Sequence, residues 1–143
     1  MTFDSGGLQV KPDKAMHDMK LDMAGAATVI GVMQYLDTIP DLPVNIIGAI
    51  GLVENMSGGN AYKPLDIYRA FNGKTVEIHH TDAEGRLLLA DVMSYVESEY
   101  KVDNLMTIAT LTGACMHALG YNYAGIMGDD EDSILELTSL SQV

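Results

Sequence analysis

The first long pattern in the chain is a set of apolar side chains that recur at helical spacing through residues 17–37. Positions three or four apart share one face of a helix, so this segment predicts an amphipathic helix. Gly25 lowers the helix propensity there, which either a close packing contact or a functional approach would explain. The apolar positions are Met19, Met23, Ala26, Ala27, Ile30, Met33 and Leu36.

After a loop marked by Pro40 and Pro43, residues 44–53 are apolar nearly throughout. A β-rich run of this kind is typical of a strand that is covered on both faces. Further along, residues 67–71 and 75–79 flank Asn72-Gly73, the strongest short signal for a β-hairpin. These two stretches therefore predict a buried strand followed by a hairpin.

The last part of the chain alternates between helical and strand patterns. Apolar positions from Arg86 to Val96 suit a buried helix, and residues 105–109 and 124–127 predict short strands. Thr112 is placed to cap a short helix that runs to about Leu119. A final helix is expected over residues 133–140, since its pattern is again helical.

Strands that alternate with helices favour an α/β fold, here a three-layer sandwich with a mostly parallel (mixed) central sheet. The chain has 143 residues, near the size of one domain, and 48% of them are hydrophobic. We find no internal repeat or flexible linker, so residues 1–143 are expected to belong to one domain. The chain opens on Met1-Thr2-Phe3, which resembles the last piece of a strand and is typical of a fragment.

The net charge of the chain restricts the classes of partner that we expect it to bind. Lys and Arg number 8 against 20 Asp and Glu, a formal net charge of -12. Such a surface repels phosphate backbones and anionic membranes, so we expect neither as a partner. The single Cys115 excludes an internal disulfide, no basic-then-apolar leader opens the chain, and no apolar run is long enough to cross a bilayer. A cytoplasmic protein is expected.

The densest chemistry lies in His80-Thr81-Asp82-Ala83-Glu84-Gly85-Arg86. If the backbone is extended there, Asp82 and Glu84 leave on the same face, because the side-chain period of a strand is two. The apolar run after Arg86 makes this a strand end, a carboxylate-bearing turn and a helix start. Two carboxylates this close repel each other unless a cation lies between them. The alternative is a solvated acidic turn.

Two further carboxylates fall where such a sheet delivers residues to its edge. Asp4 follows the first strand, and Asp22 lies within the first predicted helix. With Asp82 and Glu84 they form an oxygen-rich set that suits two Mn, Mg or Zn ions. Paired ions activate a water and polarise a carbonyl or phosphoryl oxygen.

Two cations close to these carboxylates in sequence, Lys11 and Arg86, are placed to stabilise an oxyanion or to hold an anionic co-reactant. Ordinary ion pairs are the alternative for both residues.

Other polar residues are weaker candidates. His79 and His80 are adjacent, so on a strand they point to opposite faces and cannot chelate one ion together. Ser5 lacks the Gly-x-Ser-x-Gly elbow of a nucleophilic serine. Cys115 sits among apolar residues and is expected to be buried and inert.

Six stretches together resemble the catalytic domain of the leucyl (cytosol) aminopeptidases, two-metal enzymes that remove N-terminal residues from peptides. They occur in the family's order and cover most of the chain to about Gly128. These are Thr2-Phe3-Asp4-Ser5-Gly6-Gly7 with Lys11-Pro12, residues 19–27, Glu54-Asn55-Met56, Asn72-Gly73-Lys74-Thr75, Thr81-Asp82-Ala83-Glu84-Gly85-Arg86 and Thr110-Leu111-Thr112-Gly113-Ala114.

The resemblance implies roles for the matched carboxylates. Asp4 and Glu84 would bridge two divalent ions, Mn or Zn. Asp82 would complete the more exchangeable site, and Asp22 the tighter site beside the amino group of the substrate.

It also implies roles in catalysis and substrate binding. Lys11 would polarise the scissile carbonyl, and Arg86 would hold a bicarbonate that serves as general base. Met19 and Thr110 match positions near the side-chain pocket, whereas Leu111 and Gly113 match positions along the substrate backbone. Lys11 and Asp22 would also contact the substrate. The full-length parent would act on peptides as a homohexamer.

The chain departs from the family pattern in several places. A metal-binding Lys would precede Met1, and both the N-terminal domain and the C-terminal part of the catalytic domain lie outside these residues. His80 replaces a usual Asn and Ala24 a usual Gly. The expected fold is therefore truncated relative to the family's catalytic domain. A non-catalytic module that binds metal or peptide remains an alternative, as does a two-metal phosphohydrolase, which no motif supports.

Overall fold

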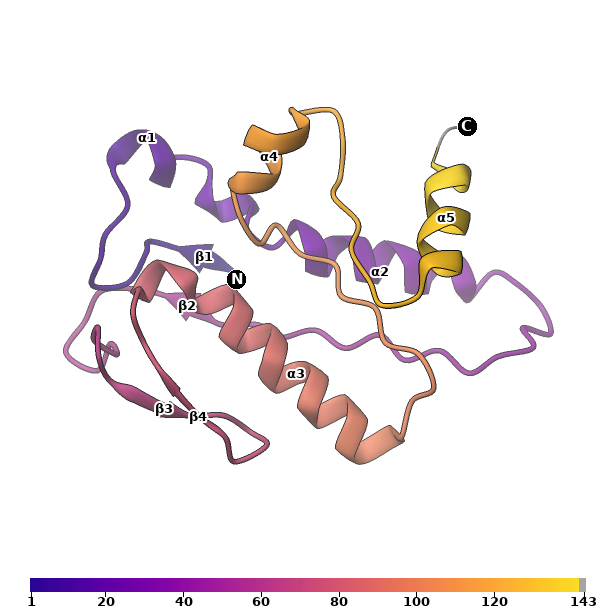
Figure 1. Ribbon diagram of the computed structural model, residues 1–143, viewed down its shortest axis with the longest axis horizontal. Helices are drawn as coiled ribbons and strands as arrows, with labels where there is room; N and C mark the ends of the chain where they lie inside the picture. The colour runs from indigo at the N-terminus through magenta and orange to yellow at the C-terminus, as the bar shows by residue number, and fades with distance from the viewer. Residues whose placement is uncertain (142–143) are drawn as a thin grey trace. The chain divides into compact units, whose positions relative to one another are not determined.

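The computed structural model describes residues 1–141 of the chain (Figure 1). These residues divide into two compact units, the first comprising Met1–Leu111 and the second beginning at Thr112. The first unit carries the motif at residues 80–86 and every predicted metal ligand. The two units are described separately below.

The helix predicted over residues 17–37 is interrupted. It is replaced by a 3₁₀ turn, η1 (Met19–Leu21), and a helix, α2 (Ala24–Leu36). The break falls at Asp22, whose backbone N–H donates to the Met19 carbonyl and whose own carbonyl accepts from the Met1 amino group. Asp22 therefore lies between the two elements, and its expected place within a helix was wrong. A short helix, α1 (Asp13–Met16), precedes them.

The central helix agrees with its prediction, since α3 (Glu84–Tyr100) follows the motif directly. It is preceded by η2 (Thr81–Ala83), a 3₁₀ turn that carries the first of the motif's carboxylates. The left-handed backbone of Lys101 ends α3, and its N–H donates to the Glu97 carbonyl.

The predicted hairpin is confirmed. Strands β3 (Ile67–Arg69) and β4 (Thr75–Glu77) pair antiparallel across the Asn72-Gly73 turn, with Tyr68 opposite Val76. Asp91 on α3 holds the hairpin, because its carboxylate accepts hydrogen bonds from the Phe71 N–H and the Tyr68 hydroxyl.

A second pair of strands lies in the first unit, next to the start of the motif at residues 80–86. Strands β1 (Phe3–Asp4) and β2 (Glu54–Asn55) pair parallel, with Phe3 opposite Glu54 and Asp4 opposite Asn55. The carboxyl ends of both strands therefore open on the same edge, where parallel sheets commonly place their ligands.

Residues 44–53 run as a middle layer between α2 and α3, as Figure 1 shows. A Cβ added to Gly48 would lie 2.7 Å from the Met33 side chain of α2, whereas one added to Gly51 would lie 2.8 Å from Leu88 of α3. The first unit thus has the three-layer α/β arrangement that was expected.

Within the described residues, neither 44–53 nor 105–109 forms a strand ladder, contrary to the pattern-based prediction. Apolar β-branched composition suits a buried layer, but a ladder also requires a partner backbone in register. In the described residues, only the end of the first segment has one, where the Thr2 N–H donates to the Val53 carbonyl.

Gly25 marks a close approach between α2 and the segment that follows α3. A Cβ at this position would stand 2.2 Å from the Ile108 carbonyl oxygen and 2.7 Å from the Ala109 Cα. The packing explanation for this helical glycine is therefore correct.

Much of the apolar surface stays exposed in the described residues. Ile78 and Val96 are the large apolar residues that are buried there, whereas Ile30, Val32 and Tyr35 of α2 are exposed. Apolar residues around most of a helix are typical of one that is covered on several sides. The described residues contain no helix with the length and hydrophobicity needed to traverse a bilayer.

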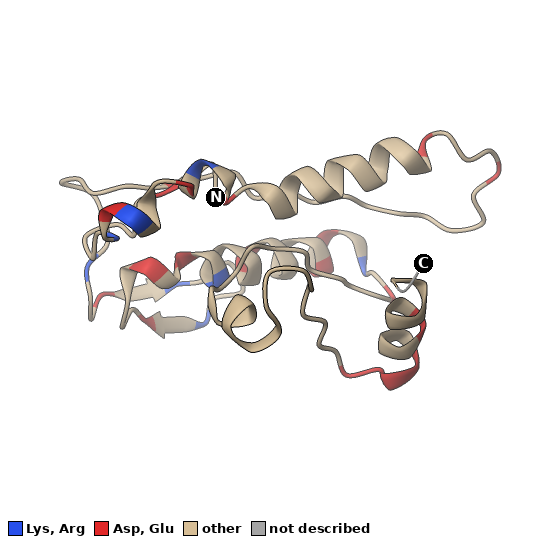
Figure 2. Ribbon diagram, turned by 90° about the horizontal axis from the view of Figure 1, so that it is seen from above, with Lys and Arg blue, Asp and Glu red and all other residues tan. Residues whose placement is uncertain are grey.

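The second unit contains α4 (Ala114–Leu119) and α5 (Glu131–Leu140). The Thr112 hydroxyl accepts the Ala114 N–H, as the capping prediction requires. No strand forms at 124–127 in the described residues. Helix α5 begins earlier than expected because the Asp130 carboxylate accepts the Asp132 N–H, within the acidic run that Figure 2 shows in red.

Candidate metal centre

Asp4 is presented by a tight turn at the end of β1. Gly6 and Gly7 adopt positive φ angles of 89° and 71°, which strain any residue with a Cβ. A Cβ at Gly6 would also lie 2.5 Å from the Gln9 carbonyl oxygen. The turn brings the Gly6 N–H within 2.9 Å of Asp4 Oδ1, so the carboxylate is held at 4% exposure.

Asp82 and Glu84 are presented by η2 and the first turn of α3, not by an extended backbone. Asp82 has φ -91° and ψ 21°, so the premise of an extended strand was wrong. The reason is local capping: His80 is extended, and its Nδ1 accepts the Asp82 N–H at 3.2 Å, which starts the helical turn. The expected carboxylate turn and helix start are correct, but the expected strand end is not, because β4 ends at Glu77 and His80 is extended without belonging to a strand.

Three of the predicted ligands converge. One carboxylate oxygen from each of Asp4, Asp22 and Glu84 lies within 4.8 Å of the others. Asp4 and Glu84 are buried and Asp22 is half-buried. The three come from a strand end, an interhelical turn and a helix start, so the tertiary fold alone assembles them.

Lys11 connects this cluster to Asp82. Its ammonium lies 2.8 Å from Asp4 Oδ2 and 2.5 Å from Asp82 Oδ1. Burial opposes the charged form of Asp4, but Lys11, the Gly6 N–H and Asn55 outweigh it and lower its pKa. The same balance applies to Lys11: its burial is outweighed by Asp4 and Asp82, which raise its pKa. Both side chains are thus held charged.

Glu84 is electrostatically unmatched. Burial, followed by the charges of Asp4 and Asp82, raises its pKa from 4.5 to about 7. Its Oε2 is buried without a hydrogen-bond partner in the described part of the chain. Burial and the same three carboxylates raise the pKa of Tyr62 to about 12. The site therefore carries excess negative charge in a buried position, and a bound cation would offset this charge.

The donor set fits a divalent metal. Carboxylate oxygens are the preferred ligands of Mg and Mn, and they also coordinate Zn. The Glu84 oxygen without a hydrogen-bond partner is available as a ligand atom. Asp4, Asp22 and Glu84 are close enough to share an ion, and Asp82 lies beside them across Lys11.

Of the other predicted site residues in the first unit, Thr110 contacts the cluster directly. The Thr110 hydroxyl donates to Asp22 Oδ1 at 2.8 Å, which brings this residue to the site. Met19 is half-buried in η1, and Leu111 lies near Gly85. Arg86 is exposed, and among residues 1–141 it forms no ion pair.

Gly113 belongs to the second unit and precedes α4. The weaker candidates do not join the cluster. The Ser5 hydroxyl is committed to the Asn55 carbonyl at 2.7 Å, and His79 is exposed beside Glu77. Cys115 is only half-buried, which differs from the expected full burial.

Three polar residues around Asp4, two of them buried and one half-buried, were not singled out from the sequence. Asn55 donates to Asp4 Oδ1, Thr81 is completely buried, and Gln9 pairs with the Thr81 backbone. The available signal was positional: Asn55 is a polar residue that directly follows an apolar strand-like run, at the edge where Asp4 was expected.

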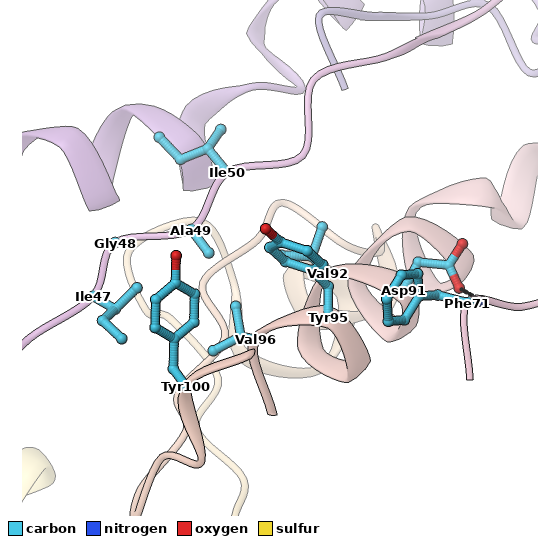
Figure 3. Close-up of a pocket in the computed structure, with 10 residues that line it drawn as sticks. All are labelled: Ile47, Gly48, Ala49, Ile50, Phe71, Asp91, Val92, Tyr95, Val96 and Tyr100. Atoms are coloured by element: carbon cyan, nitrogen blue, oxygen red, sulfur yellow. Dashed lines mark hydrogen bonds between the residues drawn. The ribbon is translucent and has the colours of Figure 1, made fainter. Parts of the chain in front are cut away.

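A separate hollow of about 420 Å³ lies between α3 and residues 47–50 (Figure 3). Aromatic and aliphatic side chains line it, among them Phe71, Tyr95 and Tyr100. Asp91 is the carboxylate on its wall, and that group is already used by the hairpin. The candidate centre is therefore a different place in the unit.

A three-layer α/β unit with carboxylates gathered at the carboxyl end of a parallel strand pair defines the class: an α/β protein with a candidate carboxylate metal centre. The comparisons then identify the family. The chain belongs to the cytosol aminopeptidase family, whose catalytic domain it matches over residues 1–143.

Its relatives agree. Over 131 residues it is 50% identical to the probable cytosol aminopeptidase of Cenarchaeum symbiosum, a match that covers 92% of this chain and 27% of that protein. It is 49% identical to the one from Photobacterium profundum over 142 residues, which is 99% of this chain and 28% of that protein.

Among solved structures, the leucine aminopeptidase of Caenorhabditis elegans matches with a TM-score of 0.88 and 35% identity. That match covers 99% of this chain and 29% of the solved chain. The chain therefore spans little more than a quarter of the length of these relatives.

Proposed function

We propose that the full-length protein is a metal-dependent aminopeptidase that releases N-terminal residues of the leucine type from peptides. The observation that carries this proposal is the convergence of Asp4, Asp22 and Glu84 within a chain that belongs to the cytosol aminopeptidase family. A buried carboxylate cluster with an unpartnered oxygen is a costly feature for a fold to keep without a cation.

In this proposal two divalent ions, Mn or Zn, are held by four carboxylates. Asp4 and Glu84 would contribute to both ions, Asp22 would complete one site and Asp82 the other. Bound ions supply an activated water and a polarised carbonyl. Two observations support this assignment. One oxygen from each of Asp4, Asp22 and Glu84 lies within 4.8 Å of the others, and Asp82 lies beside Lys11.

The cations and neutral residues act on the substrate. Lys11 is the group that polarises the scissile carbonyl, because its charge is held at the cluster. Arg86 is free of ion pairs in residues 1–141 and is proposed to hold a bicarbonate as general base. The remaining substrate contacts are assigned to Met19, Asp22, Thr110, Leu111 and Gly113.

The family membership also supports the wider setting of the protein. Its relatives are named cytosol aminopeptidases, so we propose a cytoplasmic location and peptide partners. Residues 1–143 would form part of one catalytic domain, in a parent that assembles as a homohexamer.

The test is peptidase activity of the full-length protein on leucyl-4-nitroanilide, with and without Mn or Zn. We expect metal-dependent release that EDTA abolishes. Asp22→Ala should lower kcat/KM by at least about 100-fold, because it removes a proposed ligand. Asp18→Ala, which removes an exposed carboxylate four residues away, is the matched control and should change little.

Elemental analysis after dialysis against Mn separates activity from binding. Two ions per full-length chain with no release of product would favour a non-catalytic metal-binding protein. No bound ion and no hydrolysis would refute the proposal.

A further inference from the structure

The side chain of Asn55 joins two of the turns that carry proposed metal ligands, the turn of Asp4 and the turn of Asp82 and Glu84. Asn55 ends β2 directly opposite Asp4 in the parallel register, and it is only 5% exposed. Its Nδ2 donates to Asp4 Oδ1 at 2.9 Å and to the Thr81 carbonyl, also at 2.9 Å. Both amide hydrogens are therefore committed.

The orientation of this amide follows from its surroundings. Its two acceptors, a carboxylate and a carbonyl oxygen, require the NH₂ group to face them. The amide oxygen faces the Gly7 turn, where an added Cβ would lie 2.9 Å from Asn55 Oδ1. A flipped amide would set its oxygen against Asp4 and the Thr81 carbonyl, so each acceptor would lose one of its two donors.

Thr81, the other acceptor, is the anchor of the second loop. It is completely buried, and its hydroxyl donates to the Gly6 carbonyl at 2.6 Å and accepts the Gln9 N–H at 2.9 Å. Its backbone N–H donates to the Gln9 side chain at 2.7 Å. Thr81 precedes Asp82 and Glu84 directly, so its position sets where η2 and α3 begin.

We propose that Asn55 is a positioning residue for the metal centre. Its amide fixes the rotation of the Asp4 carboxylate and the spacing between the Asp4 turn and the turn that carries Asp82 and Glu84. This inference rests on the proposed function, since it assumes that these carboxylates bind metal. Groups that orient metal ligands by hydrogen bonds commonly contribute 10- to 100-fold to metal affinity.

The choice of an amide has a chemical reason. Asp4 Oδ1 accepts two N–H donors, from Gly6 and Asn55, while Oδ2 faces Lys11. A neutral donor orients the carboxylate without adding a positive charge that would repel a bound cation. Asn55 also satisfies the Thr81 carbonyl, so one side chain sets two loops.

The test measures the affinity of the full-length protein for Mn by isothermal titration calorimetry, without substrate. We expect Asn55→Ala to raise the dissociation constant by about 10- to 100-fold. Tyr62→Phe is the matched control, because it removes the other hydrogen bond to the Thr81 carbonyl, at 2.8 Å, and leaves Asp4 untouched. Its dissociation constant should stay within about threefold of the wild-type value.

Thermal unfolding in EDTA separates positioning from stability. Both variants should lose stability, because each leaves the Thr81 carbonyl with one donor fewer, but only Asn55→Ala should lose metal affinity. If Asn55→Ala does not fold, Asn55→Ser, which is smaller but still polar, carries the same expectation.

Unchanged affinity in the Asn55 variant, with binding intact in the wild type, would overturn this inference alone. A wild-type protein that binds no Mn would overturn the proposed function and this inference together.

Discussion

At the scale of single residues, the carboxylates of the site carry more negative charge than the one ammonium of Lys11 neutralises. Its ammonium is shared by Asp4 and Asp82, both within 2.8 Å, whereas Glu84 forms no ion pair among residues 1–141. The pKa of Glu84 is consequently raised to about 7, while that of Asp4 is lowered. This difference identifies Glu84 as the group that destabilises the metal-free protein.

Replacing Glu84 with Gln should stabilise the metal-free protein at neutral pH and weaken metal binding. The pKa of Glu84 is about 7 in the folded state, raised from 4.5, so folding favours its protonated form. Its contribution to the free energy of unfolding is therefore fully present below pH 4.5 and is lost as the pH rises through 7. Gln does not ionise, so this loss disappears in the variant. Urea unfolding in EDTA should show a gain of about 1–2 kcal/mol at pH 8, allowing for solvent screening.

The pH dependence is the decisive part of this prediction. At pH 5 most of the gain should vanish, since Glu84 is then largely protonated in the folded state. Glu97→Gln, at an exposed position of the same helix, should show no such change with pH. An equal gain for Glu84→Gln at both pH values would contradict the electrostatic account.

At the scale of elements, the middle layer is held by close contacts with the helices on either side. Met33 of α2 approaches Gly48, and Leu88 of α3 approaches Gly51, while α2 also meets residues 108–109 at Gly25. Small residues at such points allow the backbones to meet, and a side chain there forces a shift that costs stability.

Two glycines of α2 should respond oppositely to alanine. At Gly25 the new Cβ would meet the Ile108 carbonyl at 2.2 Å, so Gly25→Ala should destabilise the protein by about 2–3 kcal/mol. A Cβ added at Gly31 would meet no atom of another described element within 4 Å, so Gly31→Ala should stabilise the protein by about 0.5–1 kcal/mol through helix propensity. Chemical denaturation measures both. Stabilisation by both variants would contradict the tight contact.

At the scale of the whole molecule, two opposing surface properties compete. Apolar side chains such as Ile30, Val32 and Tyr35 are exposed on α2, which favours association. The formal net charge of -12 opposes it, because copies of the chain repel one another. Salt screens the second effect and leaves the first in place.

The isolated 143-residue chain should therefore self-associate more strongly as salt is added. Light scattering coupled to size exclusion should give a mass above 15.4 kDa, and one that is larger at 500 mM than at 20 mM NaCl. Buffer with arginine in place of salt, which masks apolar surface, serves as the comparison. A monomeric mass under every condition would contradict the prediction.

Local features were predictable from the sequence. The hairpin follows from Asn72-Gly73, and helix α3 follows from the apolar spacing after Arg86. Each depends on residues within one or two turns, so a pattern contains the information. Asp22 was misplaced because a local pattern does not show that its carbonyl accepts a hydrogen bond from the Met1 amino group, 21 residues away.

The sequence by itself determined the chemical content of the site: which carboxylates and cations exist, and in which turns they stand. Only the tertiary structure decided which of them meet. Asn55 lies 51 residues from Asp4, and Thr110 lies 88 residues from Asp22, yet both pairs are hydrogen-bonded. The physical reason is that periodicity encodes the faces of single elements, whereas strand register and layer packing set contacts between distant ones.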